Sequence, residues 1–499
     1  MATQNTIETG IATTNDGDHA YDGFVEIGDS VTVNPGIIVS AGGAGAHGIF
    51  SNVANSAVTV GSGALVSSVQ GIGIALTGLY NGYIGGSGIL VDSTATVAGA
   101  QYGATLDGSL NLVGNSGTIR GANGVKIGGN FASGNTIRQS ATGSIIGTGA
   151  TSMGVDILGD ALVENAGLIQ GVDFGINVRF ARTFSLVNDG TIRGIAAINI
   201  SGSDTSSTIL NYGRIEGDIS LGGKSDVYEG RSGYVSGTVY LADGNDRFFG
   251  SARAETIDPG FGNDTIDGGG GADVVVYVGN RADSTIVSNS DRSFTIVSGT
   301  GDTDVLRNVR SVKFADTAAF ALGFNLTGTA SANALTGGWG DDVLSGGAGN
   351  DVLNGAEQGK DYLIGGTGND RLSGGTDSDR LAGGAGNDTL SGGTGKDVFV
   401  FNAPLSSTSN KDRILDWNYR DDTIQLENAV FRKLTKTGAL NKAYFVLNSV
   451  AKDSNDYVGY DSRTGDLWYD SNGSAAGGKM VFANIGVKKT IGIYDFAVI

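Results

Sequence analysis

The chain has 499 residues, of which 86 are Gly, 3 are Pro and none is Cys. Lys and Arg total 32 against 51 Asp and Glu, and the resulting net charge of −19 argues against nucleic acid as a partner. The lack of cysteine excludes a disulfide-stabilised fold, and no stretch is apolar for long enough to span a membrane. So much glycine with so little proline is typical of tight, repeating turns.

Residues 1–22 are predicted to form an N-terminal arm. The opening MATQNTIETG has neither the basic start nor the apolar core of a cleavable signal peptide, so we expect any export signal elsewhere in the chain. The two histidines, His19 and His47, are isolated from one another and from other metal-binding residue types. We expect both to be ordinary turn or surface residues, because a metal or catalytic histidine needs partners.

Residues 23–240 contain a long repeat, and an all-β fold is predicted from it. NSGTIRGANGVKI begins at Asn115, NAGLIQGVDFGINV at Asn165, NDGTIRGIAAINI at Asn188 and NYGRIEGDISL at Asn211, and the last three asparagines are 23 residues apart. Each unit holds three short apolar stretches divided by Gly and Asn, which is typical of strands, and a period of this length indicates stacked coils. The prediction is a right-handed parallel β-helix, with a sandwich of short strands as the alternative.

The asparagine that begins each of these units falls at a fixed turn. Asparagine tolerates the left-handed backbone conformation and hydrogen-bonds locally through its amide. We therefore expect these asparagines to adopt that conformation and to bond their neighbours in the next coil.

A first calcium-binding β-roll is predicted for residues 241–276, where acidic residues recur every nine positions at Asp246, Glu255, Asp264 and Asp273. Residues 277–325 interrupt the pattern with alternating strands such as STIVSNSDRSFTIVSG, and we interpret them as a β insertion that caps the first roll.

A second roll is predicted for residues 326–400, where the phrase GGxGxDxUx repeats and U is a large apolar residue. A disordered Gly/Asp-rich linker is not expected to carry Leu at a regular interval, so the pattern favours a folded roll. The aspartate at the sixth place recurs every nine residues, with one interval of ten, at Asp342, Asp351, Asp361, Asp370, Asp379, Asp388 and Asp397.

The residue types of this phrase explain its length. Glycine permits the positive φ angles of a tight turn, and the U residue points inward from a short strand. Two repeats make one coil of about eighteen residues, which stacks the aspartates in two columns, and stacked carboxylates repel unless a cation lies between them. Calcium fits, because it accepts about six to eight oxygen ligands in flexible geometry.

We expect several structural calcium ions, held by carboxylates and by turn carbonyls. The predicted ligands are Asp246, Asp264 and Asp273 in the first array, the seven aspartates of the second array, and the carbonyl groups of Gly340, Gly349, Gly368, Gly386 and Gly395.

Residues 401–499 lack the glycine repeat and are predicted to form a β-rich cap. Aromatic residues concentrate there, at Trp417, Trp468, Tyr469 and Phe482, as the cover of an open solenoid end requires.

The nonapeptides resemble the RTX family, which Gram-negative bacteria export through type I secretion systems. The end of the chain, from Asp495 to Ile499, is similar to the acidic and apolar export tail of that family. The resemblance implies an ABC exporter as a partner, passage as an unfolded chain, and folding outside the cell on meeting calcium. The N-terminal repeats separately resemble the β-helices of bacterial adhesins and autotransporter passengers.

The sequence lacks the motifs of three activities that are common among RTX proteins. Neither histidine begins the HExxH of the proteases, the GxSxG of the lipases does not occur, and the long apolar helices of the pore-forming toxins are missing. GGKSD at Gly222 lacks the spacing of a phosphate loop, and DSNGS at Asp470 lacks the layout of a twelve-residue calcium loop.

The sequence favours a secreted, calcium-folded structural protein of the Gram-negative cell surface, of surface-layer, filament or adhesin type. Its partner would be another copy of itself. The alternative is an extracellular polysaccharide lyase or epimerase, or a carbohydrate-binding protein, which would use Asp173, Arg179 and Arg182 on one coil.

Overall fold

A computed structural model describes residues 4–7, 11–14, 30–41, 47–51, 56–76, 87–129, 132–356, 358–406, 408–447, 450–475 and 477–499. Contacts divide the chain into two compact units, one of residues 1–286 and 294–319 and one of residues 287–293 and 320–499. Within the described residues both units are built of strands, apart from three short 3-10 helices, at Arg281–Asp283, Lys442–Tyr444 and Ile493–Asp495. The prediction of an all-β protein is confirmed.

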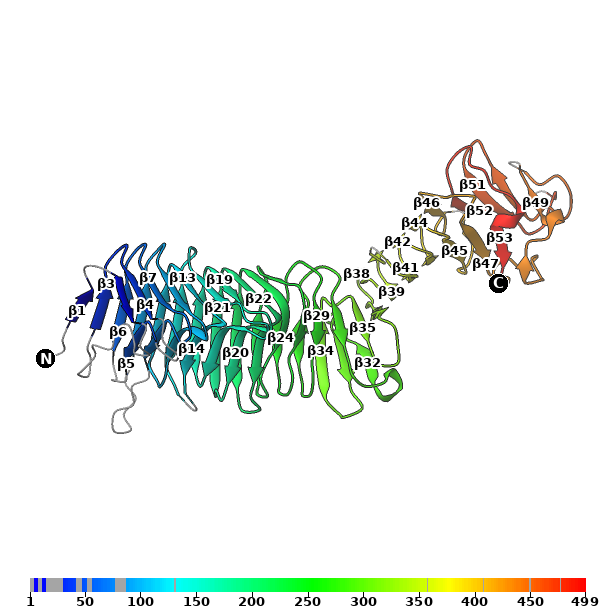
Figure 1. Ribbon diagram of the computed structural model, residues 1–499. Helices are drawn as coiled ribbons and strands as arrows, with labels where there is room; N and C mark the ends of the chain where they lie inside the picture. Colours follow the sequence, from blue (N-terminus) through cyan, green and yellow to red (C-terminus); the bar gives the residue numbers. More distant parts are fainter. Residues whose placement is uncertain are drawn as a thin grey trace. The chain divides into compact units, whose positions relative to one another are not determined.

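The first unit is a stack of coils that begins at β1 and ends at β35 (Figure 1). One face of the stack is a single sheet, in which nearly all neighbouring strands run parallel. Its strands in spatial order are β1 (Gln4–Ile7), β3 (Ser30–Val33), β6 (Ala57–Val60), β9 (Gly88–Val91), β12 (Leu112–Asn115), β15 (Asn135–Gln139), β18 (Ala161–Asn165), β21 (Thr183–Asn188), β23 (Ser206–Asn211), β25 (Val227–Glu229), β28 (Arg247–Phe249), β30 (Thr265–Asp267), β34 (Thr303–Arg307), β33 (Phe294–Val297) and β32 (Thr285–Ser288).

The other two faces share a second sheet, because the long strands β22 (Thr191–Ser201) and β24 (Arg214–Ser220) each contribute to both. The second face holds β2 (Ile11–Thr14), β4 (Ile38–Ala41), β7 (Leu65–Ser68), β10 (Thr96–Gly99), β13 (Thr118–Gly121), β16 (Ser144–Gly147), β19 (Leu168–Gln170), β24 (Arg214–Ser220) and β26 (Tyr234–Val235). The third face holds β5 (Ile49–Ser51), β8 (Ile74–Leu76), β11 (Tyr102–Leu106), β14 (Asn123–Gly128), β17 (Met153–Leu158), β20 (Phe174–Arg179), β27 (Thr238–Tyr240), β29 (Thr256–Asp258), β31 (Val274–Val276) and β35 (Ser311–Lys313).

The register of these strands follows the repeat in the sequence. In the first sheet Val163 lies opposite Leu186, and Leu186 opposite Ile209, so consecutive coils are offset by one 23-residue unit. All three side chains are fully buried and form the core of the stack. The parallel β-helix predicted from the repeat is therefore confirmed, and the sandwich is excluded because the pairings are parallel.

A ladder of buried amides lines one corner of the β-helix. Asn165 Nδ2 donates to Asn188 Oδ1 at 2.8 Å, and Asn188 Nδ2 donates to Asn211 Oδ1 at 2.9 Å. Gln139 connects Asn115 to Asn165 in the coil where the repeat is degenerate. The predicted bonds between coils are confirmed. The predicted left-handed backbone is wrong, because each asparagine is the last residue of a strand and has no positive φ angle.

From residue 241 the coil continues with two strands instead of three. β28 pairs with β25 and β30, while β29 pairs with β27 and β31, so the first nonapeptide array extends the sheets of the β-helix. A coil of eighteen residues, the spacing between Asp246 and Asp264, has no room for a third strand. After residues 277–302, β34 and β35 rejoin the stack in parallel with β30 and β31.

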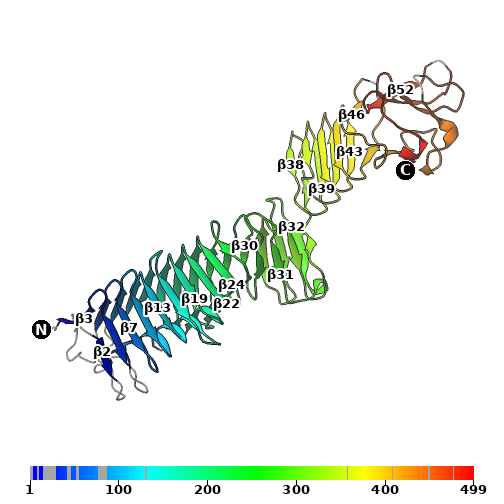
Figure 2. The ribbon, with the colours of Figure 1, turned by 45° about the horizontal axis from the view of Figure 1, so that its top comes forward.

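The second unit contains the second array, whose coils form two facing sheets (Figure 2). One sheet holds β37 (Asn325–Thr327), β39 (Val343–Ala348), β41 (Tyr362–Thr367), β43 (Arg380–Ala385), β45 (Val398–Phe401), β47 (Thr423–Leu426), β53 (Phe496–Val498) and β48 (Gly438–Ala439). The other holds β38 (Ala334–Thr336), β40 (Val352–Asn354), β42 (Arg371–Thr376), β44 (Thr389–Thr394), β46 (Asp412–Ile414), β52 (Lys479–Asn484), β51 (Asp466–Asp470), β50 (Val458–Asp461) and β49 (Phe445–Val446).

The apolar U residues of the array fill the space between these two sheets. Their exposed fractions do not exceed 2%, as the inward orientation predicted from the motif requires, at Leu344, Leu353, Leu363, Leu372, Leu381, Leu390 and Phe399. Residues after 401 then cover the last coil, since Phe399 packs on Trp417 and Phe401 on Phe482. The terminal strand β53 pairs with β47 and completes this cover.

Candidate metal centre

The aspartates of the second array stack in two columns, one on each side of the roll. Asp342, Asp361, Asp379 and Asp397 form the first column, in which the Oδ1 of each of the last three accepts the backbone N–H of the aspartate one coil earlier. The distances along that column are 2.9, 2.9 and 3.0 Å. The second column is formed by Asp351, Asp370 and Asp388, with distances of 2.8 Å. The hydrogen bonds fix every carboxylate in one orientation.

The second carboxylate oxygen has no partner in five of these seven aspartates, whereas Asp342 Oδ2 accepts the N–H of Gly338 at 2.7 Å. Each column aspartate of the array is 1–2% exposed, so water does not reach it. Within the described residues, a buried Oδ2 atom without a hydrogen-bond partner occurs at Asp226, Asp246, Asp264, Asp273, Asp351, Asp370, Asp379, Asp388 and Asp397. Burying an unpaired carboxylate oxygen costs several kcal/mol, and a bound cation removes that cost.

Glycine forms the wall of each carboxylate site. A Cβ on Gly374 would overlap Asp379 Oδ2, and the first glycine of every other repeat meets the aspartate of its own repeat in the same way. At the turn, Gly368 has a φ of +134°, and a Cβ there would overlap the carbonyl oxygen of Gly349. The Oδ2 atoms thus face backbone rather than side chains.

The five turn glycines predicted as carbonyl donors occupy one repeated position. Gly349, Gly368 and Gly386 stack in line on the side of the Asp351 column, while Gly340 stacks against Gly359 on the side of the Asp342 column. Gly395 stacks instead on Asp377, which replaces the glycine of its repeat and adopts a φ of +73°. Their role as calcium ligands stays a prediction.

The residues present fit calcium. The donor atoms are oxygens only, from fixed carboxylates and turn carbonyls, which is the donor set that a hard cation prefers. No column aspartate forms an ion pair with Lys or Arg among the described residues. No three His, Cys, Asp or Glu side chains of the described chain converge on one point. A roll site does not need such a cluster, because each turn supplies one carboxylate and several carbonyls.

The first unit carries the same arrangement at the predicted residues. Asp246 N donates to Asp264 Oδ1 at 2.8 Å, and Glu255 N donates to Asp273 Oδ1 at 2.8 Å. Glu255 differs from the aspartates, because its carboxylate is bound by the backbone and hydroxyl groups of Ser251. Asp246, Asp264 and Asp273 keep an unpartnered Oδ2, and their role as calcium ligands stays a prediction.

Burial controls the protonation of the columns. The pKa of Asp361 is raised to about 7, mainly by burial. The hydrogen bond from the backbone N–H of Asp342 lowers this pKa, and the nearby charges of Asp342 and Asp379 raise it. Burial likewise raises the pKa of Asp379 to about 7 and that of Asp388 to about 6. Protons and calcium therefore compete for the same oxygens near neutral pH.

The pH dependence of stability should reverse with calcium. Without calcium, the folded roll binds more protons than the unfolded chain between about pH 4 and pH 7, so its stability is present at low pH and is lost as pH rises through the folded pKa values. We expect circular dichroism to show more strand structure in the second unit at pH 5 than at pH 8 in calcium-free buffer. In millimolar calcium the order should invert, because protons then displace the cation. The same direction in both buffers would contradict this account.

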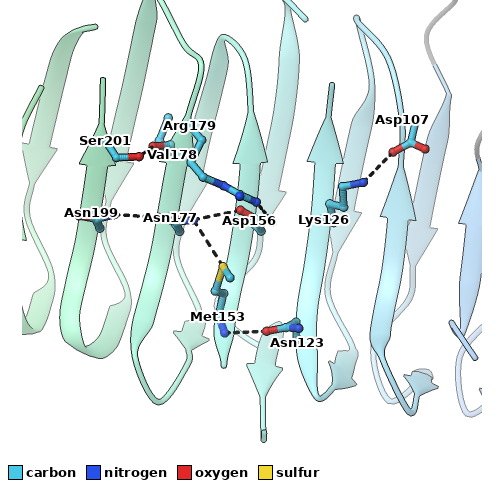
Figure 3. A network of polar contacts seen from close by, with 10 residues as sticks. All are labelled: Asp107, Asn123, Lys126, Met153, Asp156, Asn177, Val178, Arg179, Asn199 and Ser201. Atoms are coloured by element: carbon cyan, nitrogen blue, oxygen red, sulfur yellow. Dashed lines mark hydrogen bonds and ion pairs between the residues drawn. The ribbon is translucent and has the colours of Figure 1, made fainter. Parts of the chain in front are cut away.

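A polar network lies on the third face of the β-helix (Figure 3). Arg179 Nη2 contacts Asp156 Oδ2 at 2.6 Å, and Asn177 Nδ2 donates to Asp156 Oδ1 at 3.1 Å. The Asp156 side chain is 1% exposed and that of Arg179 is 38% exposed. Asp156 is not among the residues predicted from the sequence, and the 23-residue repeat does not reveal it, because the coil offset here is 21 residues and Asp156 lies opposite Asn177.

The structure does not bring together the three residues proposed for a uronate site. Asp173 precedes β20 and Arg179 ends it, a separation of roughly 20 Å along an extended strand. Arg182 follows the next turn, where its N–H donates to Asp160 Oδ1 at 2.6 Å.

The remaining candidates are turn residues. His47 Nδ1 accepts the N–H of Ile72 at 3.1 Å, while His19 lies outside the described residues. Asp470 Oδ1 accepts the N–H of Asn472 at 3.1 Å, as in an ordinary Asx turn.

Comparison with known proteins supports the calcium assignment. A family model described as the RTX calcium-binding nonapeptide repeat matches residues 240–275, 325–355, 356–390 and 373–403. Among solved structures, the extracellular lipase LipA from Serratia marcescens is similar, with 13% identity and a TM-score of 0.17, over 59% of this chain and 40% of that chain. No curated protein sequence matches. The chain therefore carries RTX repeats, and these bind calcium at several sites.

Proposed function

We propose that this RTX-repeat protein is a secreted structural protein of the Gram-negative cell surface that assembles with copies of itself in the presence of calcium. Export through a type I secretion system accords with the repeats and with the similarity of residues 495–499 to an export tail. No described helix has the length and apolar character of a membrane span. The calcium ions would stabilise the fold rather than take part in chemistry.

An exposed apolar corner on the β-helix carries the assembly proposal. It lies between the second and third faces of the coils, where each coil turns after a glycine or serine. Val69, Val172 and Ile195 occupy this corner with exposed fractions of 68%, 42% and 72%. Val172 and Ile195 are adjacent, since the N–H of Ile195 donates to the carbonyl of Val172 at 3.0 Å.

These three residues form what we call the corner row. Exposed apolar groups that recur along a rigid stack favour lateral contact with another surface. Val172 and Ile195 stand in neighbouring coils, whereas three coils separate them from Val69, and the corner of those coils begins with Ala100, Ala122 and Thr148. A second copy of the chain presents the same row and so is the partner that this surface fits best.

Placing charged side chains in the corner row tests whether this row mediates assembly. Replacing both Val172 and Ile195 with Asp should abolish assembly at millimolar calcium, because buried charges would oppose lateral packing. Light scattering and electron microscopy of the full-length protein would measure this, with Val278→Asp as a matched control, since Val278 is 71% exposed and lies outside the row. A monodisperse wild-type protein at millimolar calcium would contradict the proposal.

An acidic polysaccharide is the second candidate partner. An open groove of about 450 Å³ crosses the first sheet and is lined by Arg138, Glu164, Asp92 and Asp189. We rank it second because its cation is already paired, with Arg138 Nε 2.6 Å from Glu164 Oε2. Binding of alginate by calorimetry, or release of unsaturated uronates that is lost in Arg138→Ala, would favour this function over assembly.

A further inference from the structure

The carboxylate column of the first unit extends beyond the nonapeptide pattern. Asp246 and Asp264 are its nonapeptide members, and Asp226 precedes them by one coil. The N–H of Asp226 donates to Asp246 Oδ1 at 2.7 Å, just as the N–H of Asp246 donates to Asp264 Oδ1 at 2.8 Å. Asp226 thus occupies the sixth place of a repeat, although the segment GGKSD around it lacks the spacing of the motif.

A second ladder, one residue before the aspartates, shows the same continuity. The N–H of Asn263 donates to Asn245 Oδ1 at 2.9 Å, and the N–H of Asn245 donates to Ser225 Oγ at 3.2 Å. The nonapeptides of the second unit have this ladder as well, with Asn387 N donating to Asn369 Oδ1 at 2.8 Å. The turn that contains Ser225 therefore has the backbone register of a nonapeptide turn.

Lys224 takes the place of the turn glycine. A Cβ on Gly244 would lie 2.8 Å from the carbonyl oxygen of Lys224, and a Cβ on Gly262 would overlap the carbonyl oxygen of Gly244. The carbonyl of Lys224 is thus stacked in line with the turn carbonyls of the array. Its amino group points elsewhere, 3.5 Å from Asp204 Oδ1, and does not neutralise the column.

Asp226 also has a buried Oδ2 atom without a hydrogen-bond partner, like most aspartates of the arrays. Its Oδ1 accepts the Ser207 hydroxyl at 2.7 Å, whereas its Oδ2 is buried without a partner. The residue is 1% exposed, as is Asp246 one coil later. A cation between the coils would remove the cost of burying this pair of uncompensated carboxylates.

We propose that Asp226 is a calcium ligand outside the nonapeptide repeats and shares one ion with Asp246. The ion would bind the last three-strand coils of the β-helix, because Asp226 immediately precedes β25 and accepts a hydrogen bond from Ser207 near the N-terminal end of β23. Calcium would then stabilise the β-helix itself at its junction with the first array, in addition to the array.

The test compares Asp226→Asn with Asp189→Asn in the full-length protein. Asparagine at 226 keeps the acceptor for Ser207 and removes the charge, while Asp189 is an exposed turn residue of the same β-helix. Calcium per chain, measured by atomic emission after equilibrium dialysis, should fall by about one ion only in Asp226→Asn. Calcium should slow hydrogen exchange in β23 about tenfold in the wild type and in Asp189→Asn, and by less in Asp226→Asn.

An unchanged calcium count in Asp226→Asn, with exchange in β23 still slowed by calcium, would overturn the proposal. If Asp226→Asn does not fold, hydrogen exchange of the wild-type protein with and without calcium tests the proposal instead. Protection by calcium that reaches β23 and stops before β21 supports the proposal, and equal exchange in β23 with and without calcium overturns it.

Discussion

Calcium removal is expected to unfold the nonapeptide roll of the second unit, over residues 325–401. Its columns bury carboxylates whose Oδ2 atoms have no partner, so the calcium-free fold carries an electrostatic penalty in every coil. At millimolar calcium and a dissociation constant of about 10⁻⁴ M, each site contributes about 1.4 kcal/mol by mass action. Several such sites together approach the total stability of a typical domain, about 5–15 kcal/mol.

Hydrogen exchange of the full-length protein measures this directly. We expect strong protection of β39, β41, β42, β43 and β44 in millimolar calcium and its loss in excess chelator, with circular dichroism showing a matching loss of strand signal. Magnesium at the same concentration is the control, because it demands a tighter octahedral geometry and should restore little. Equal protection of these strands with and without calcium would show that the roll folds without the ion.

Removing the charge of Asp379 should affect the calcium-bound and calcium-free states in opposite directions. Asp379 lies in the middle of its column, between Asp361 and Asp397, and serves the positions above and below it. Asp379→Asn keeps a carbonyl acceptor for the N–H of Asp361. At millimolar calcium the variant should lose about 3 kcal/mol, the contribution of two sites, and without calcium it should gain stability because a buried charge is gone.

Asn333→Ala is the matched control for this experiment. Asn333 stands at the start of the other column, carries no charge, and is only half-buried, although Asp351 Oδ1 accepts its N–H at 2.7 Å as in the rest of the array. Its substitution should shift the midpoint of a calcium titration less than Asp379→Asn does. If both variants shift the midpoint equally, or if Asp379→Asn destabilises both states, the carboxylates do not bridge calcium.

The nonapeptide roll could be predicted almost completely from the sequence. The interval between aspartates indicates the length of a coil, and the interval between Leu residues indicates which side chains point inward. These local intervals suffice because each repeat contacts only its neighbours. Asp377 shows the limit of the motif, since a non-glycine residue adopts the turn conformation with a φ of +73°. The turn geometry is set there by the stacked coils above and below, not by the local residue.

The sequence by itself determined the parallel β-helix, the roll, the ion and the residues of both aspartate columns, because all of these depend on periods within the chain. The tertiary structure decided which carboxylate oxygens lack a partner, that the first array continues the sheets of the β-helix, and that Asp156 pairs with Arg179. It also placed Asp226 in line with the carboxylate column of the first array, which the sequence around Asp226 does not indicate. The physical reason is that stacking brings residues one coil apart into contact, and a degenerate coil keeps its register through its neighbours even where its motif is lost.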